Sequence, residues 1–287
     1  MNLLELLKVS IEHLKSQGLD NPKTSCEILL AHTLNMKRLD LYLNYDLQLK
    51  ESEISEFRKL YKRRLNREPL QYILGETEFM SLPFKINTDV LIPRPETELL
   101  VEKIIDFCKS KWTDKPLKIL DIGSGSGNIS VSLAHYLSES EVIGIDVSPE
   151  SIKVAEANGK LNNVQDRVRF IVEDILSVDE DHPDFKDLNV IVSNPPYVTT
   201  DSMDILQKEV IDHEPHAALF AGKDGMIFFR KIASIAKNRL NEGGLLVFET
   251  GYDIGEKVKS LVMENGFRDV NLIKDYAGIN RIVMGIK

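Results

Sequence analysis

Four consecutive residues, Asn194-Pro195-Pro196-Tyr197, combine hydrogen-bond acceptors with a flat aromatic ring directly after the apolar run 188–192. Proline fixes φ and has no N–H to donate, so a strand that ends here must turn away at its carboxyl end. The Asn194 side-chain oxygen and the Pro195 carbonyl could accept both hydrogens of a planar NH2 group while Tyr197 lies on its face. A proline-rich turn with a surface tyrosine is the alternative, and these four residues alone do not decide between the two readings.

A glycine-rich turn, Gly123-Ser124-Gly125-Ser126-Gly127, follows the apolar run 117–122. Glycines let a ligand approach the backbone closely, and N–H groups at a helix N-terminus favour a carboxylate or phosphate. A dinucleotide fingerprint needs its third glycine at position 128, where this chain has asparagine, and no Gly-Lys-Ser/Thr follows as a P-loop requires. The spacing therefore fits the tighter Gly-x-Gly-x-Gly turn.

Two acidic residues follow the next two predicted strands: Asp146 ends the second strand, and Asp174 with Ile175 comes after the third. Asp146 could accept hydrogen bonds from both hydroxyls of a ribose, and Asp174 from an adenine amino group, with Ile175 packing on the ring. Each carboxylate taken singly is more often a turn residue or a helix cap. Open α/β sheets bind ligands at the carboxyl ends of their strands, so the order of these groups predicts an adenosyl ligand beside the gripped NH2 group.

The elements that must position these groups form two patterns. Residues 1 to about 75 have apolar residues at helical spacing, and short strands forming a hairpin are predicted within 71–91. From Leu117 onward strands and helices alternate, which predicts a mostly parallel sheet. Two closing strands without a helix between them predict an antiparallel terminal hairpin. The expected strands are 117–122, 141–145, 168–172, 188–192, 245–249, 270–274 and 281–286; the expected helices of this part include 95–108, 128–137, 149–161, 201–210, 224–240 and 254–264.

The helix predicted over 52–66 carries the one dense basic cluster of the chain on what its spacing indicates is the outer side: Arg58, Lys59, Lys62, Arg63, Arg64 and Arg67. A solvated helix face is one interpretation of this cluster, and a docking surface for an RNA-associated or acidic partner is the other. The net charge of −9 over 287 residues argues against wholesale coating of nucleic acid.

Several features bound the class of protein. Cys26 and Cys108 lie far apart in helical patterns, which favours reduced core thiols in a cytoplasmic protein. The charged N-terminus does not fit a signal peptide, and no apolar run approaches 18 residues, so no membrane association is expected. His213 and His216 flank Pro215 without a third ligand near them in sequence, so no metal is expected.

The chain resembles the class I S-adenosylmethionine-dependent methyltransferases, and within them the HemK/PrmC family, the N5-glutamine methyltransferases of peptide chain release factors. The resemblance covers nearly the whole length and rests on five segments: 71–75, 92–98, 121–127, 193–197 and 214–225. Asn-Pro-Pro-Tyr is shared with DNA amino-methyltransferases, whereas the segment from Ile92 to Glu98 singles out the glutamine enzymes.

The resemblance implies a fold and a division of the chain. The fold is an α/β, Rossmann-like, mostly parallel sheet with an antiparallel terminal hairpin, behind a small all-α N-terminal domain and a β-hairpin connector. Residues 1–75 would be the helical substrate-docking domain, 76–93 the connector and 94–287 the methyltransferase domain.

The resemblance also implies roles for residues. S-adenosylmethionine would be held by Gly123, Ser124, Gly125, Ser126, Gly127, Asp146, Asp174, Ile175 and Asn194. Asn194, Pro195, Pro196 and Tyr197 would bind the glutamine of a Gly-Gly-Gln loop, with Asn194, Pro195 and Tyr197 in the catalytic role. Phe84 and Arg94 are also expected to line the site.

The expected reaction is a direct displacement at the sulfonium methyl group, helped mainly by positioning, since the methylated nitrogen can lose its proton to water. A peptide chain release factor is the expected partner, without direct nucleic-acid contact and with the enzyme as a monomer. Two other readings remain: a DNA or RNA exocyclic-amine (adenine N6) methyltransferase, which needs base flipping, and a non-catalytic module that binds S-adenosylmethionine.

Overall fold

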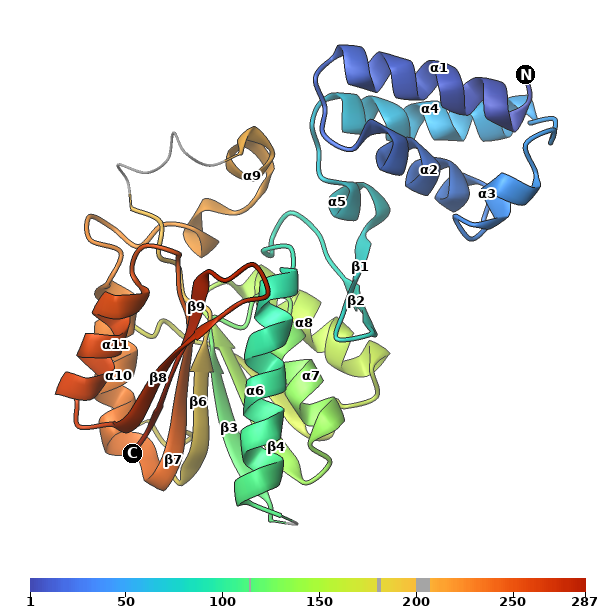
Figure 1. Ribbon diagram of the computed structural model, residues 1–287. Helices are drawn as coiled ribbons and strands as arrows, with labels where there is room; N and C mark the ends of the chain where they lie inside the picture. The colour runs from blue at the N-terminus through green and yellow to red at the C-terminus, as the bar shows by residue number, and fades with distance from the viewer. Residues whose placement is uncertain (114, 180–181, 200–206) are drawn as a thin grey trace. The chain divides into compact units, whose positions relative to one another are not determined.

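The computed structural model describes residues 1–113, 115–179, 182–199 and 207–287 (Figure 1). The described chain divides into two compact units. The first, here called the helical unit, comprises Met1–Glu76 with Gln207–His213; the second, the catalytic unit, comprises the described residues of 77–206 together with 214–287.

The helical unit is built from amphipathic helices around a leucine-rich core. Asn2 caps the first helix in a capping box, because its side chain accepts from the Glu5 N–H while the Glu5 carboxylate accepts from the Asn2 N–H, each at 2.9 Å. Leu3, Leu30 and Phe57 are buried in the core. The helices are α1 (Leu3–Ser16), α2 (Pro22–Thr33), α3 (Asp40–Leu43), α4 (Glu51–Leu65) and α5 (Leu70–Leu74), and α9 (Lys208–His213) joins them from far along the chain.

The helical prediction for residues 1–75 is confirmed, but the part of the 71–91 strand prediction that covers Tyr72 to Leu74 is wrong. Tyr72 and Ile73 are both buried in the short helix α5, which starts after Pro69 and ends at Gly75 in the left-handed region (φ 74°). Three consecutive apolar residues cannot distinguish a buried strand from one turn of helix. The hairpin itself is confirmed, with strands β1 (Glu76–Phe79) and β2 (Leu82–Lys85).

The basic cluster on α4 is not an outer face throughout. Arg64, expected to point outward, is only 4% exposed, and its guanidinium donates to the Glu209 carboxylate at 3.0 Å and to the Glu68 carbonyl at 3.1 Å. Arg63 pairs with the Glu68 carboxylate, and Arg67 donates to the carbonyls of Gln17 and Gly18. Three of the six basic residues therefore hold the helical unit together.

The Arg64–Glu209 ion pair also explains why α9 belongs to this unit. A helix over 201–210 was predicted; residues 200–206 lie outside the described residues, and the described helix runs over Lys208–His213.

A seven-stranded sheet forms the catalytic unit (Figure 1). Its strand order is β5-β4-β3-β6-β7-β9-β8, with β3 to β7 parallel and the last two strands antiparallel. This confirms the predicted fold class. The strands are β3 (Leu117–Ile122), β4 (Ser140–Asp146), β5 (Val168–Val172), β6 (Leu188–Ser193), β7 (Leu240–Glu249), β8 (Arg268–Lys274) and β9 (Asn280–Ile286).

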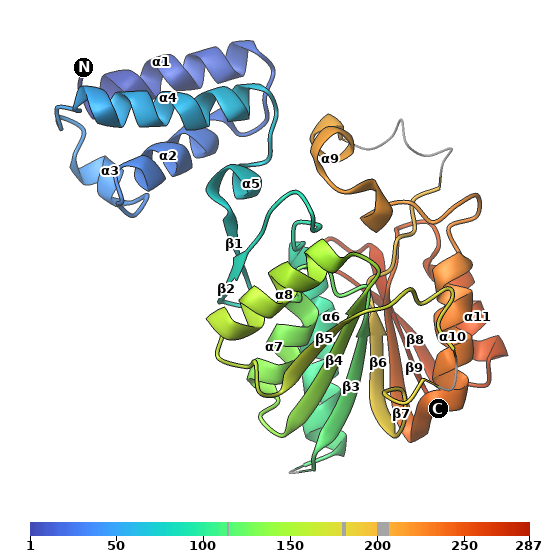
Figure 2. The ribbon, with the colours of Figure 1, turned by 180° about the vertical axis from the view of Figure 1, so that it is seen from behind.

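Helices cover both faces of this sheet (Figures 1 and 2). One core packs α6 and α7 on the sheet through residues such as Leu100, Val131 and Val192; the other packs α10 and α11 through residues such as Phe229 and Val258. The helices are α6 (Pro95–Lys111), α7 (Asn128–Tyr136), α8 (Pro149–Leu161), α10 (Ile227–Arg239) and α11 (Gly255–Glu264), with a 3-10 turn η2 (His216–Ala218).

Helix α10 and strand β7 begin at other residues than the sequence predicted. α10 starts at Ile227 rather than Asp224, because Asp224 acts before the helix: it accepts from the Met226 N–H at 3.1 Å and pairs with Arg230 at 2.7 Å. β7 starts at Leu240 and runs through Gly243 and Gly244, with an irregular register against β6. Across the described residues, no helix combines the length and apolarity that spanning a membrane requires.

Candidate active site

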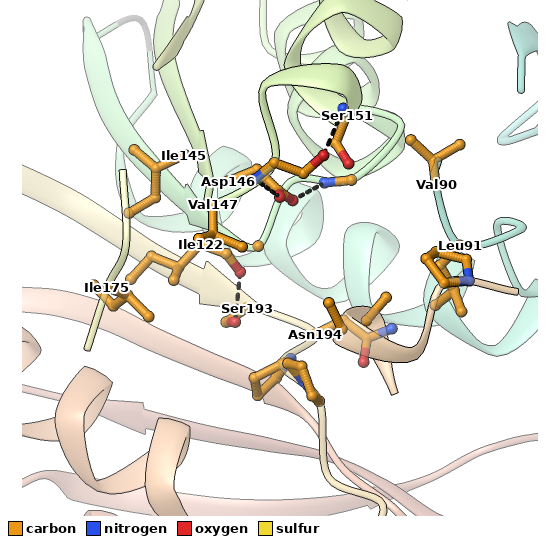
Figure 3. A pocket seen from close by; sticks show the side chains of 18 of the residues that line it. Val90, Leu91, Ile122, Ile145, Asp146, Val147, Ser151, Ile175, Ser193 and Asn194 are labelled. Atoms are coloured by element: carbon orange, nitrogen blue, oxygen red, sulfur yellow. Dashed lines mark hydrogen bonds between the residues drawn. The ribbon is translucent and has the colours of Figure 1, made fainter. Parts of the chain in front are cut away.

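A cavity of about 470 Å³ opens at the carboxyl ends of the parallel strands of the catalytic unit. Such a volume is typical of small-molecule sites. Figure 3 shows Asp146 and Ser151 along one side of it and Ser193 with Asn194 along the other. The walls are contributed by 88–91, Ile122, Gly123 and Gly125, 145–148, Glu150 and Ser151, 173–176, 193–196, Pro215, Ala217, Ala218, and Phe228 and Ile232 of α10.

The glycine turn after β3 is held by backbone hydrogen bonds, both to β4 and within the turn. The N–H groups of Gly123 and Ser124 both donate to the Ile145 carbonyl at 2.9 Å, and the Gly127 N–H donates to the Ser124 carbonyl at 2.7 Å. Gly127 has φ 76°, and a Cβ there would lie 2.9 Å from the Phe170 ring, so only glycine fits. Gly123 and Gly125 line the cavity; Ser124, Ser126 and Gly127 are not among the lining residues.

Asp146 ends β4, and its side chain holds this turn in place through a hydrogen bond. Its Oδ2 accepts from the Gly125 N–H at 2.8 Å and its Oδ1 from the Ser148 N–H at 3.0 Å. Burial raises the pKa of this carboxyl above its ordinary value, and the backbone N–H bonds oppose that rise. Because each carboxylate oxygen has two lone pairs, Asp146 can still accept further bonds from a ligand in the cavity.

Asp174 and Ile175 lie together in the wall of the same cavity after β5. Asp174 accepts from the Leu176 N–H at 2.9 Å, and Ile175 is buried beside Ile122 and Ile145. The structure thus brings together an apolar wall and two acids, as the sequence predicted. This combination of an apolar wall and two acceptors fits an adenosyl ligand, because the wall suits a purine ring and the acids suit hydroxyl and amino groups.

The Asn194 corner begins where β6 ends. The Ser193 hydroxyl donates to the Ile122 carbonyl at 2.6 Å, which ties the end of β6 to β3. Asn194, Pro195 and Pro196 line the cavity. Within the described part of the chain, the Asn194 carboxamide makes no hydrogen bond to another residue.

Tyr197 is not among the lining residues and lies toward the end of β7. A Cβ on Gly251 would lie 3.0 Å from its Cδ2 atom, so glycine at 251 makes room for the ring. Burial raises the pKa of Tyr197 to about 12, and the nearby Glu249 carboxylate adds to the rise. Tyr197 is therefore a neutral aromatic group at neutral pH.

Two buried acids near the strand ends were missed in the sequence. Asp121 accepts from the Ser130 N–H at 3.1 Å and hydroxyl at 2.6 Å, and burial raises its pKa to about 7. Glu249 ends β7, one register step beyond the Ser193–Phe248 pair, and burial raises its pKa to about 7 against a hydrogen bond with Thr97. In the described residues neither Asp121 Oδ1 nor Glu249 Oε2 has a hydrogen-bond partner. An acid at or next to the last residue of an apolar strand is the signal that could have found both.

Two residues that were expected to line the site, Phe84 and Arg94, do not line the cavity. Phe84 does not line the cavity: it is wholly buried with its ring edge-on to Phe79, because alternation along β2 turns it into the core. Arg94 is not a lining residue either, and pairs with Glu214 at 2.7 Å. No sequence signal marked Leu91 or Pro215 as lining residues.

Known families match both parts of the chain. Residues 5–75 match the PrmC N-terminal domain and residues 113–274 a methyltransferase domain. Among solved structures, a methyltransferase from Pyrococcus furiosus has a TM-score of 0.51 at 18% identity, covering 82% of this chain and 98% of that one. The hMettl16 catalytic domain has a TM-score of 0.55 at 15% identity, covering 83% of each chain. At these identities the two structures show the fold alone.

Curated relatives are more similar, and they match nearly all of this chain. A release factor glutamine methyltransferase of Clostridium botulinum is 37% identical over 287 residues, which is 100% of both chains. That of Fusobacterium nucleatum is 38% identical over 286 residues, covering 99% of this chain and 78% of the relative. The resemblance drawn from the sequence is thereby confirmed. The chain belongs to the release factor glutamine methyltransferase family of S-adenosylmethionine-dependent methyltransferases.

Proposed function

We propose that this chain transfers a methyl group from S-adenosylmethionine to the side-chain amide nitrogen (N5) of the glutamine in the Gly-Gly-Gln motif of a peptide chain release factor. Family membership supports the reaction and the substrate. The observation that carries the assignment to a site is the Asn194 carboxamide, which lines the cavity and, within the described part of the chain, is bonded to no other residue.

The cofactor end of the site would use the glycine turn and the two acids. Gly123 and Gly125 allow close approach to the backbone, while Asp146 accepts from ribose hydroxyls and Asp174 from the adenine amino group, with Ile175 on the ring. Ser124, Ser126 and Gly127 would act indirectly, by shaping the turn. When bound, S-adenosylmethionine supplies an electrophilic methyl group whose bonding electron pair leaves with sulfur.

The substrate end would use the Asn194 corner. An amide nitrogen is a poor nucleophile, because its lone pair is delocalised into the carbonyl. The Asn194 oxygen and the Pro195 carbonyl would each accept one N–H of the glutamine, fixing its plane, while Pro196 holds the turn and Tyr197 offers an uncharged ring to the amide face. After transfer the nitrogen loses its extra proton to water, so no side chain is required as a base. Positioning of this kind can contribute about 7–11 kcal/mol.

The proposal assigns a separate role to each of three parts of the chain. Residues 1–75 would form the docking domain for the release factor, 76–93 the connector and 94–287 the methyltransferase domain. The acidic net charge of −9 supports a protein substrate over direct nucleic-acid binding. We propose a monomer that acts in the cytoplasm, where release factors are used.

Labelled methyl transfer tests this function. The purified chain is incubated with S-adenosylmethionine carrying a labelled methyl group and either a release factor or duplex DNA. Label is expected in the release factor alone, and a release factor whose Gly-Gly-Gln glutamine is changed to alanine should stay unlabelled. Label in the DNA would contradict the proposed substrate, and no label in either would contradict the enzyme assignment.

A further inference from the structure

Glu214 is a buried carboxylate that the proposed reaction does not use. Its side chain is 2% exposed, and its Oε1 accepts from the Arg94 guanidinium at 2.7 Å. Its Oε2 accepts from the Ile92 N–H at 3.4 Å. Two different groups of the 92–94 segment therefore converge on one carboxylate that is 120 residues away in sequence.

The two segments that the Arg94–Glu214 ion pair joins both continue into residues that line the cavity. Leu91, directly before Ile92, lines the cavity, and Pro95 after Arg94 starts α6. On the Glu214 side of the contact, Pro215, Ala217 and Ala218 follow Glu214 along the chain and also line the cavity. Neither Arg94 nor Glu214 is itself among the lining residues.

The segment that Glu214 begins then reaches the Asn194 corner. The Val198 N–H donates to the Leu219 carbonyl and the Ala221 N–H to the Val198 carbonyl, both at 2.9 Å. Val198 follows Tyr197 directly, so the corner cannot shift without moving residues 219–221. Further along, a Cβ on Gly225 would lie 2.7 Å from the Tyr197 carbonyl oxygen, which shows how closely the chain packs there.

We propose that Arg94 and Glu214 are positioning residues for methyl transfer: their ion pair fixes residues 214–221, and through the two Val198 hydrogen bonds this segment fixes the Asn194-Pro195-Pro196-Tyr197 corner against the cavity. The inference rests on the proposed function and adds residues that touch neither substrate nor cofactor. Removing Arg94 leaves the buried Glu214 charge uncompensated. Replacing the Glu214 carboxylate removes the charged acceptor shared by the Arg94 guanidinium and the Ile92 N–H, so the segment is expected to loosen when either partner is changed.

The ion pair is tested with Glu214→Gln and Arg94→Gln, with Arg94→Lys as the conservative variant. Both glutamine variants are expected to lower kcat about tenfold or more, because misplacing reacting groups slows the step itself. Their KM for the release factor should change less than kcat, and Arg94→Lys should recover most of the lost rate because it keeps the charge. Arg169→Gln, which breaks the Arg169–Asp184 pair away from the cavity, is the matched control and should keep the wild-type rate.

Hydrogen exchange gives a readout that does not depend on turnover. The amides of Val198 and Ala221 are expected to exchange faster in Glu214→Gln and Arg94→Gln, while amides within β3 and β6 keep their protection. Variants with wild-type kcat and unchanged exchange at Val198 would overturn the inference, as would equal loss of protection throughout the sheet. A wild-type protein that transfers no methyl group to a release factor would instead overturn the proposed function, whatever the exchange shows.

Discussion

Two turns at the carboxyl ends of adjacent strands, after β3 and after β6, use their polar groups in opposite ways. The Gly123–Gly127 turn directs its N–H groups to the Ile145 carbonyl and the Asp146 carboxylate, so its shape is complete without a ligand. At the Asn194 corner proline fixes the backbone, and the Asn194 carboxamide has no partner among the residues the structure describes. A binding turn can be organised by internal bonds, whereas a group that must grip a substrate has to be kept available for it.

The largest effect is expected from Asn194→Ala. Methyl transfer should fall to background, by a factor of about 10²–10³, the usual cost of deleting one group that acts in the transition state. S-adenosylmethionine affinity, measured by calorimetry, should change only a few-fold, because the glycine turn and Asp146 stay intact. Asn271→Ala, at an exposed position on β8, is the control. Full activity in Asn194→Ala would remove that residue from the mechanism.

Gly127→Ala should break the other turn through its backbone. At φ 76° the new Cβ would lie 2.9 Å from Phe170 Cζ and 3.0 Å from Ala155 Cβ, so strain and overpacking add to about 2–4 kcal/mol. Gly123→Ala has the same φ but meets no atom within 4 Å, so it should cost about 1–2 kcal/mol. Chemical denaturation measures both, and equal losses would show that packing against Phe170 is unimportant.

Asp146→Asn should weaken cofactor binding more than turnover. The neutral amide cannot replace both charge-assisted acceptors, and each such bond contributes about 1.5–3 kcal/mol. We expect S-adenosylmethionine affinity to fall about tenfold or more, with kcat at saturating cofactor reduced less. This pattern is the reverse of that expected for Asn194→Ala; a pure kcat loss at unchanged affinity would contradict the division between the two turns.

The smallest expected effect is a pH dependence at Glu249. Burial raises its pKa from an ordinary 4.5 to about 7, so the folded wild type holds this proton more tightly than the unfolded chain and loses stability as pH rises through that window. Glu249→Gln carries no titratable proton, so its stability relative to wild type should increase between pH 5 and pH 8 by at least about 1 kcal/mol. Denaturation curves at both pH values test this, and a constant difference would mean that Glu249 is not buried as described.

Local sequence patterns sufficed for the parts of the site carried by short motifs. The turns after β3 and β6 and the acid at the end of β4 each follow an apolar run directly, so their place at one sheet edge could be predicted. Asp174 and Ile175 were found in the same way. The alternation of strand and helix predicted the parallel sheet and its antiparallel end.

What the sequence did not reveal depends on contacts between distant residues. Arg64 reads as an outward basic residue until Glu209, 145 residues later, packs on it. Glu214 reads as a loop acid until Arg94 meets it, and Glu249 becomes a neighbour of the Asn194 corner only through the register of β6 with β7. No local pattern encodes such pairings.

The central claim is that the Asn194 corner holds the flat side-chain carboxamide of the substrate glutamine, so that its nitrogen can be methylated. Tandem mass spectrometry of a release factor treated with the enzyme and S-adenosylmethionine tests it most directly. A single added methyl group is expected on the side-chain nitrogen of the Gly-Gly-Gln glutamine with the wild-type enzyme, and none with Asn194→Ala. A methyl group on any other residue, or the same product from the Asn194→Ala enzyme, would contradict the account.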